Sequence, residues 1–290
     1  MNKIALFLGM ALALTAGAAE KKIVFIAGPL SHGPGEHEHR AGCLLLQSCL
    51  GKVPGVTSEV YSNGWPKDAE AAFKDASAIV IYSDGGGNHP FLQGDRLEQL
   101  DRLMKKGVGM VAIHYAVEPT KEKGEKEFLD WIGGAFEIHR SVNPHWLAEF
   151  KQLPKHPITT GVNPFAIQDE WYFFMRFRDG MKSVTPILSA VAPESTMERP
   201  DGTHSGNPEV RASVKRGDPQ HMAWAAERDD GGRGFGFTGA HFHRNWGNND
   251  FRKLVLNAIL WTAKAEIPAN GAQSNVTEED LKKNLDKKGK

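Results

Sequence analysis

The stretch KIVFIAGPLSHGPGEHEHRAGCLLLQSCL (residues 22–50) contains an apolar run, a polar loop and a segment with helical spacing. The run KIVFIAG (22–28) is typical of a buried strand, and residues 38–50 are typical of the helix that follows it. A strand followed by a helix is the unit from which a parallel sheet covered by helices is built. This stretch therefore predicts an α/β fold.

The same alternation continues along the N-terminal half of the chain. Short apolar runs predict three more strands, and the amphipathic segments between them predict helices. The expected strands are 57–62, 78–87 and 108–116, and the expected helices are 65–76 and 93–107. Together with the first stretch, these segments predict four units of a mostly parallel sheet.

The C-terminal half departs from this alternation and then resumes it. Between residues 136 and about 217, Pro, Asn and charged residues interrupt short segments, which predicts an irregular insertion or cap over the sheet. Residues 221–228 and 232–242 then predict a strand pair joined by the turn DDGG. Residues 248–264 have apolar side chains at helical spacing and predict a final helix.

Composition limits the partners. The chain has 290 residues, of which 40% are hydrophobic, so it can bury one large core or two modest ones. Its 35 basic and 35 acidic residues cancel, and no summed field attracts nucleic acid or anionic lipid. We therefore expect a neutral small molecule or a glycan as the partner and no nucleic acid, and we consider a homodimer as the assembly.

The first 19 residues resemble an export signal. They contain one Lys, an apolar stretch over residues 4–14 and small residues up to Ala19. A membrane anchor is the alternative, but a bilayer core of ~30 Å requires ~20 apolar residues. We expect cleavage after Ala18 or Ala19, no membrane attachment afterwards, and a periplasmic or secreted protein. The expected division is a signal peptide (1–19), one α/β domain (20–268) and a polar tail (269–290) that is flexible or forms a loose surface helix.

The two cysteines are predicted to remain free thiols. Cys43 and Cys49 both fall in the first helix, six residues apart. That separation corresponds to about 9 Å of helical rise, which exceeds the ~7 Å limit on the Cα separation of a disulfide. We expect both to be buried packing residues.

Open parallel sheets bind ligands beyond the carboxyl ends of their strands, and several polar residues fall there. A single histidine in a loop is more often solvated or hydrogen-bonded than functional. Several such residues at the same edge of the sheet nevertheless favour one shared site, and the loop after the first strand would form one wall of it. The candidates are His32, His37 and His39 after the first strand, Asp84 and His89 after the third, His114 at the end of the fourth, and His241 and His243 at the end of the late strand.

His114 lies where the chain turns abruptly, the position at which related architectures hold a nucleophile. Imidazole cannot replace Ser or Cys in acyl transfer, so a metal ligand or general base fits His114 better. His241 and His243 would face opposite sides of a regular strand, so one of them enters the site. The sequence does not say which.

Further candidates come from the glycine turn and from the irregular region. The turn DGGGNH (84–89) lacks the Lys and Ser or Thr of a phosphate loop, and we interpret it as a tight turn that a ligand approaches closely. Aromatic rings stack on sugars, although core packing is the alternative. The expected sugar-binding residues are Asp84, His89, Asn143, Trp146, Trp171 and Trp246.

Several stretches together resemble the ThuA-like, or trehalose-utilisation, family in its exported form. They include GPLSHGPGEHEHRAG, VIYSDGGGNHP, GVGMVAIHYAVE, GGAFEIHRSVNPHW, DEWYFFMRF and GGRGFGFTGAHFHRNW, and the resemblance extends to about Pro268. It implies a flavodoxin-like three-layer sandwich related to class I glutamine amidotransferases. Those relatives carry a Cys at the elbow, where this chain has His114, so the resemblance does not extend to glutaminase chemistry. It also implies a role in disaccharide or 3-keto-sugar metabolism.

These observations lead to one main hypothesis about function. We expect a metal-assisted enzyme that acts on a sugar or 3-keto-sugar by hydrolysis, elimination or isomerisation. The expected ligands are His37, His114 and His241, with His139 and Glu170 as the next candidates. The expected ion is zinc, with manganese or iron as alternatives. The expected proton carriers are Glu36, Glu170 and His139. Two alternatives stay open: a non-catalytic carbohydrate-binding or accessory protein, and a scaffold for protein contacts.

Overall fold

The computed structural model describes residues 20–289, so the predicted signal peptide lies outside the described residues. The main sheet has seven strands in the order β2-β1-β3-β4-β11-β10-β9. The pairs from β2 to β11 are parallel, whereas β10 is antiparallel to both of its neighbours. The strands are β1 (Lys21–Ala27), β2 (Val56–Tyr61), β3 (Ala76–Tyr82), β4 (Gly109–Ile113), β9 (Val184–Val191), β10 (Pro219–Glu227) and β11 (Arg233–Phe237).

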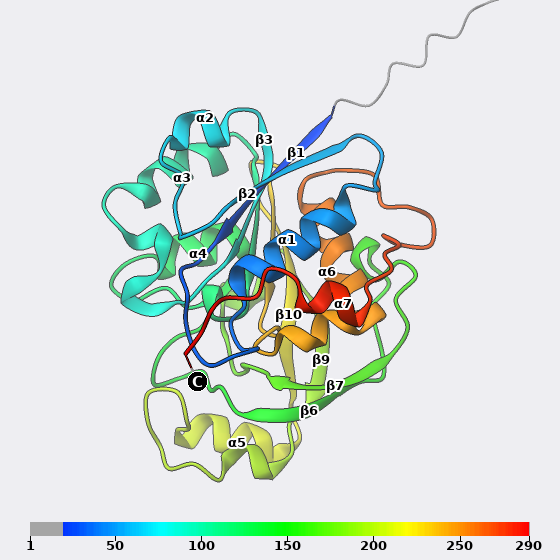
Figure 1. Cartoon of the computed structure of the whole chain (residues 1–290). Coiled ribbons are helices and arrows are strands. Elements are labelled where there is room, and N and C mark those ends of the chain that lie inside the picture. Colours follow the sequence, from blue (N-terminus) through cyan, green and yellow to red (C-terminus); the bar gives the residue numbers. More distant parts are fainter. Residues whose placement is uncertain (1–19, 290) are drawn as a thin grey trace, which may run out of the picture.

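Helices cover both faces of this sheet (Figure 1). One core contains side chains of α1 and α6, and the other contains side chains of α3 and α4. The helices are α1 (His39–Leu50), α2 (Ala69–Phe73), α3 (Arg96–Met104), α4 (Glu125–Ile132), α5 (Pro208–Arg216), α6 (Asn249–Thr262) and α7 (Glu278–Lys282). The three-layer, mostly parallel α/β sandwich predicted from the sequence is confirmed.

The apolar run of β1 is explained by its central position. Ile23 and Phe25 face the core under α1 and α6, whereas Val24 and Ile26 face the opposite core. All four side chains are completely buried. A strand covered on both faces requires apolar residues at every position, so the run is continuous rather than alternating.

The region predicted as an irregular insertion contains several elements. β6 (His145–Phe150) and β7 (Phe165–Glu170) form a separate antiparallel hairpin. β5 (Gly134–Ala135) pairs with β8 (Arg176–Phe177). β9 lies in the same region but joins the main sheet as its edge strand, and the proline at position 186 obscured it in the sequence. The predicted late strand pair is present as β10 and β11.

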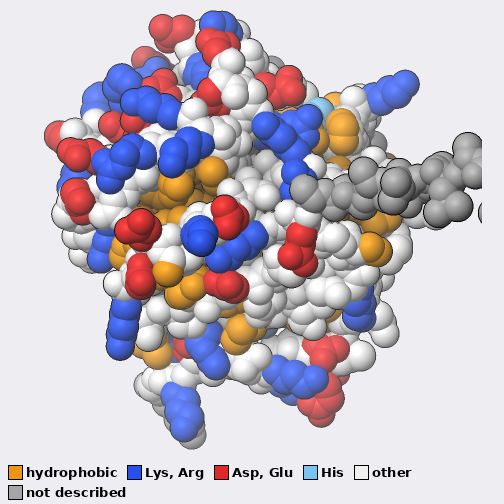
Figure 2. Space-filling model, turned by 90° about the horizontal axis from the view of Figure 1, so that it is seen from above, with side chains coloured by type: hydrophobic (Ala, Val, Ile, Leu, Met, Phe, Trp, Pro, Cys, Tyr) orange, Lys and Arg blue, Asp and Glu red, His pale blue; other side chains and the backbone are white. Residues whose placement is uncertain are grey.

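Cys43 and Cys49 are free and buried, as predicted. Both lie on α1, and burial raises the pKa of the Cys43 thiol. No helix among residues 20–289 is long and apolar enough to span a membrane. Basic and acidic side chains are interspersed on the face of the molecule shown in Figure 2. That face therefore carries no large patch of one charge.

The C-terminal tail packs against the loop that follows β1. α7 begins with a capping box formed by Thr277 and Asp280. Beyond it, the backbone N–H of Asp286 donates to Glu38 Oε2 over 2.8 Å. Lys288 forms an ion pair with Glu38 at 3.4 Å, and both side chains are almost fully buried. The tail is thus anchored beside the first histidine loop.

Candidate metal centre

Four buried side chains meet at the carboxyl edge of the main sheet. Each contributes one atom, and these atoms all lie within 4.8 Å of one another. The four residues are His37 after β1, His114 after β4, Glu170 at the end of β7 and His241 after β11. We call this group the histidine cluster. The structure thus brings together the three histidines predicted as ligands, at the edge where open sheets bind ligands.

The spacing within the histidine cluster suits one ion. His37 Nε2 lies 3.1 Å from both His114 Nε2 and His241 Nδ1. Glu170 Oε2 lies 3.0 Å from His241 Nδ1 and 3.4 Å from His114 Nε2. Four ligands about 2.1 Å from a tetrahedral ion would be about 3.4 Å apart. The four atoms therefore already lie near metal-binding distances.

Acceptors hold the outer nitrogens of two of these histidines. His114 Nδ1 donates to the backbone oxygen of Thr238 over 2.8 Å, because a carbonyl can only accept. His37 Nδ1 lies 2.8 Å from Asp84 Oδ1. Burial acts to raise the pKa of Asp84, but hydrogen bonds with His37 and Ser31, together with the nearby His39, outweigh burial and lower that pKa. The anionic carboxylate accepts, so both histidines direct an Nε2 lone pair into the cluster, as metal-binding histidines do.

Two lone pairs 3.1 Å apart repel each other unless a positive charge lies between them. A proton is an unfavourable choice, because burial lowers the pKa of His37 to about 2. Glu170 adds a negative charge: burial acts to raise its pKa, but hydrogen bonds with His114, His145 and His241 lower it. The cluster could therefore hold a metal ion.

Unusual backbone conformations aim two of the rings. His37 and His114 have φ angles of 44° and 58°, in the left-handed region that side chains rarely adopt. The abrupt turn predicted at His114 is therefore present. Such strain persists where the surrounding structure enforces it, and it is often found at functional sites.

Three neighbours of the cluster come from the hairpin region, and none was predicted as a metal-site residue. The Tyr172 hydroxyl lies 3.4 Å from His114 Nε2. The Asn143 side-chain amide donates to Glu170 Oε1 over 3.1 Å. His145 Nε2 lies 3.6 Å from the same oxygen, and that interaction raises the pKa of His145. His145 is paired with Glu170 in the hairpin register, a relationship that recognising the hairpin would have revealed.

A family model described as trehalose utilisation (ThuA) matches residues 37–262, which span the histidine cluster. The chain belongs to the ThuA, or trehalose utilisation, family. A solved ThuA-like protein from Bacteroides uniformis is 16% identical, with a TM-score of 0.60 over 87% of this chain and 95% of that one. Another from Parabacteroides merdae is 13% identical, with a TM-score of 0.56 over 91% and 99%. No curated protein matches.

In this ThuA-family chain the three tryptophans expected to stack on a sugar lie in the core instead. Trp171 and Trp246 are completely buried, and Trp146 is 5% exposed. The Trp146 indole N–H donates to the Trp171 backbone oxygen, and that of Trp171 donates to Ile167. The prediction of sugar stacking is contradicted, because a buried ring offers no face to a ligand.

Two predicted histidines also lie outside the cluster. His89 is completely buried, donates from Nε2 to the Ala116 oxygen and accepts at Nδ1 from the Phe91 N–H. Its ring is used in local structure and does not face a ligand. His139 is exposed, and its backbone rather than its ring bonds the loop at Thr203. Its predicted role as a proton carrier finds no support in this position.

The structure decides between the two late histidines. β11 ends at Phe237, so strand alternation does not apply to the residues that follow. His241 joins the cluster, whereas His243 is buried elsewhere. Neither ring nitrogen of His243 has a hydrogen-bond partner within residues 20–289. Glu36, a predicted proton carrier, is half-buried, with Oε1 3.6 Å from His241 Nε2.

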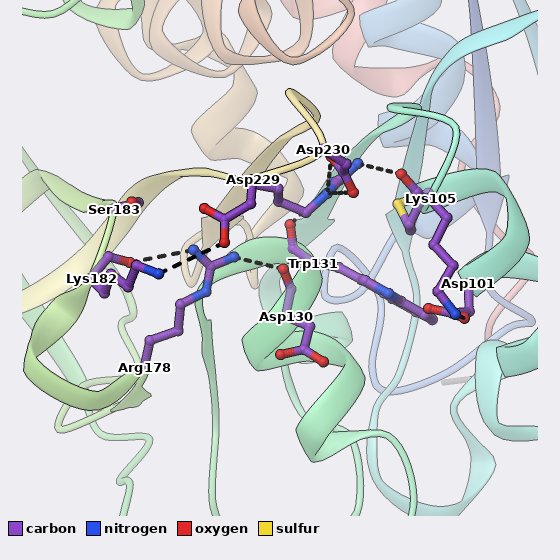
Figure 3. Close-up of a pocket in the computed structure, with 11 residues that line it drawn as sticks. Asp101, Lys105, Asp130, Trp131, Arg178, Lys182, Ser183, Asp229 and Asp230 are labelled. Carbon is purple, nitrogen blue, oxygen red and sulfur yellow. Dashed lines mark hydrogen bonds and ion pairs between the residues drawn. The ribbon is translucent and has the colours of Figure 1, made fainter.

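A separate cleft of about 400 Å³ lies at the opposite, amino-terminal edge of the sheet (Figure 3). Arg178 donates to the backbone oxygens of Leu129 and Asp130 in α4. Arg228 likewise donates to the backbone oxygen of Met104 at the end of α3. Cationic groups near helix C-termini stabilise helices. These arginines therefore join secondary structure elements, and the histidine cluster remains the candidate site.

Proposed function

We propose that this protein is an enzyme of carbohydrate metabolism that holds a divalent metal ion in the histidine cluster. Its substrate is a sugar or 3-keto-sugar, converted by hydrolysis, elimination or isomerisation. The observation that carries the proposal is the pair of Nε2 lone pairs, on His37 and His114, that face each other beside the Glu170 carboxylate. Membership of the trehalose utilisation family supports the carbohydrate part.

The donor set favours a particular group of ions. Three imidazoles and one carboxylate suit zinc, with manganese and iron as the alternatives. When bound, such an ion polarises a carbonyl or hydroxyl oxygen and stabilises the negative charge that develops on it. Glu170 belongs to this donor set, so we assign it to metal binding rather than to proton transfer.

Proton transfer is assigned to side chains at the border of the cluster. Glu36 is a half-exposed carboxylate, and its Oε2 accepts a hydrogen bond from the Gly33 N–H over 3.3 Å. It is therefore available to accept a proton from a bound sugar. Tyr172 is assigned hydrogen-bond donation rather than proton transfer, because burial raises its pKa well above the ordinary value and keeps the hydroxyl protonated.

The test begins with metal analysis of the mature chain, purified without chelator. We expect about one zinc, manganese or iron ion per chain, and conversion of at least one member of a 3-keto-glucoside panel. His114→Ala should lose both the ion and the conversion. His221→Ala is the matched control, because His221 is a half-buried histidine bonded to Ser189 in the sheet. It should retain both.

Two results would redirect the proposal. A wild-type protein that binds none of the three ions at micromolar concentration lacks the metal centre. A protein that binds both metal and sugar without converting any sugar is a carbohydrate-binding protein, not an enzyme.

A further inference from the structure

A second titratable pair lies outside the histidine cluster. His204 Nε2 is 3.1 Å from Glu118 Oε1 and 3.2 Å from Glu118 Oε2. The Glu118 side chain is 3% exposed, whereas that of His204 is 32% exposed. A buried carboxylate thus holds an imidazole that remains accessible to a ligand.

Aromatic rings connect this pair to the cluster. The Phe136 ring stacks on His204 with a centroid distance of 5.2 Å. The same ring meets Tyr172 edge-on at 5.3 Å, and the Tyr172 hydroxyl is 3.4 Å from His114 Nε2. The pair and the cluster therefore border the same group of side chains.

Hydrogen bonds provide an independent connection. The Asn143 backbone N–H donates to the His204 oxygen over 3.0 Å, and its side-chain amide donates to Glu170 Oε1 over 3.1 Å. Arg199 donates to Asn143 Oδ1 and to the His204 oxygen. The loop that carries His204 is thus fixed relative to Glu170, a member of the cluster.

The glycine turn (84–89) lies next to the pair formed by His204 and Glu118. The Gly86 N–H donates to the backbone oxygen of Glu118 over 2.8 Å. A side chain at Gly86 would meet the Tyr115 hydroxyl at 3.6 Å, while a side chain at Gly87 would meet nothing within 4 Å. Tyr115 is half-buried, and its ring centroid lies 6.1 Å from that of His37. The turn and Tyr115 therefore lie between the cluster and Glu118, where the sequence indicates close approach of a ligand.

We propose that His204, oriented by Glu118, is a second proton-transfer group of this site and acts on a hydroxyl group of the sugar bound at the histidine cluster. This inference rests on the proposed function. A polyhydroxylated substrate carries hydroxyl groups on both sides of its ring, so one sugar can contact both the histidine cluster and His204. His204 also distinguishes a sugar from a simple carbonyl compound, which lacks the second hydroxyl.

The step follows from the tautomer that Glu118 imposes. His204 Nε2–H donates to the carboxylate, so Nδ1 carries the lone pair. The Thr203 hydroxyl now lies 3.1 Å from Nδ1, and the sugar hydroxyl takes its place. The O–H bond breaks, an Nδ1–H bond forms, and the electron pair stays on the sugar oxygen. The resulting imidazolium is stabilised by Glu118, as in other carboxylate-imidazole pairs.

Charges around the pair support this role. The hydrogen bond to Glu118 raises the pKa of His204; burial and Arg199 oppose that shift, and Glu170 favours it. Burial raises the pKa of Glu118, while His204 lowers it.

The test uses the metal-loaded full chain with a methyl 3-keto-glucoside as the probe. His204→Gln and Glu118→Gln should retain the metal but lower kcat about 100-fold or more, as loss of a general base does. The pH profile should lose the limb that belongs to His204. The His221→Ala control should stay within about twofold of wild type. Wild-type conversion together with unchanged kcat in His204→Gln would overturn the inference while leaving the proposed function intact.

A second measurement does not require turnover. The imidazole carbon-proton NMR signal of His204, assigned with His204→Gln, should shift when the probe is added. Its pKa should fall in Glu118→Gln. A signal that does not move at saturating probe overturns the inference, and a wild type that binds neither metal nor probe overturns the proposed function with it.

Discussion

His37 Nδ1 lies 2.8 Å from Asp84 Oδ1, and this contact joins the loop after β1 to the loop after β3. The two residues are 47 positions apart in the sequence. The contact fixes the tautomer of His37 and turns its Nε2 toward the histidine cluster. Asp84 was expected to bind sugar, but its position makes it a supporting residue of the metal centre.

Replacing Asp84 with Asn tests this relationship. The variant keeps the shape of the side chain but removes the anionic acceptor, so His37 loses its fixed orientation. We expect zinc affinity to fall about 10- to 100-fold, measured by competition with a chelator. Asp101→Asn, at a solvent-exposed ion pair on α3, should leave the affinity unchanged. Equal zinc affinity in Asp84→Asn and wild type would show that Asp84 does not support the site.

The contact between the tail and the first loop predicts a structural role for Lys288. Lys288→Ala leaves the buried Glu38 carboxylate without its cation, which costs about 3 kcal/mol when a buried pair is broken. Glu38 also accepts from the Gly35 N–H, so the loop that carries His37 should loosen and bind metal more weakly. Urea unfolding and zinc titration measure the two effects. Lys287→Ala, an exposed neighbour, is the control, and equal behaviour of both variants would contradict the prediction.

We expect the folded protein to lose stability in acid because it contains buried histidines. Burial lowers the pKa of His89 from 6.5 to about 4, so the folded state requires the neutral ring. This contribution is complete above pH 6.5 and is lost as the pH falls toward 4, because the unfolded state binds the proton first. The loss is on the order of 3 kcal/mol. Urea unfolding between pH 7.5 and 4.5 should show a shallower pH dependence for His89→Gln than for wild type. Identical slopes would rule out this contribution from His89.

The export signal expected at residues 1–19 predicts where the mature chain begins. Small residues lie at the end of the apolar segment, so the mature chain should begin at Ala19 or Glu20. Intact mass spectrometry of protein from the periplasm or medium measures this directly. A mass that includes residues 1–18 would show that the segment is retained.

The sequence alone predicted the α/β class, six of the seven strands of the main sheet, and the edge of the sheet that carries the chemistry. Continuous apolar runs identify strands buried on both faces, because such strands tolerate no polar side chain. The topology rule also selected a set of histidines that includes His37, His114 and His241, because it depends only on position after a strand. The same rule selected His89 and His243, which lie outside the cluster. The free thiols followed from helix geometry within one element.

Only the tertiary structure decided what depends on contacts between distant segments. It selected Glu170 rather than His139 as the fourth member of the cluster, and it placed His145 opposite Glu170 in the β6-β7 hairpin. It placed His241 rather than His243 in the cluster, because the chain leaves regular strand geometry after Phe237. It placed the tryptophans in the core, because the burial of a large ring depends on what packs around it. Composition and spacing record which groups a chain carries, whereas packing decides which of their atoms face one another.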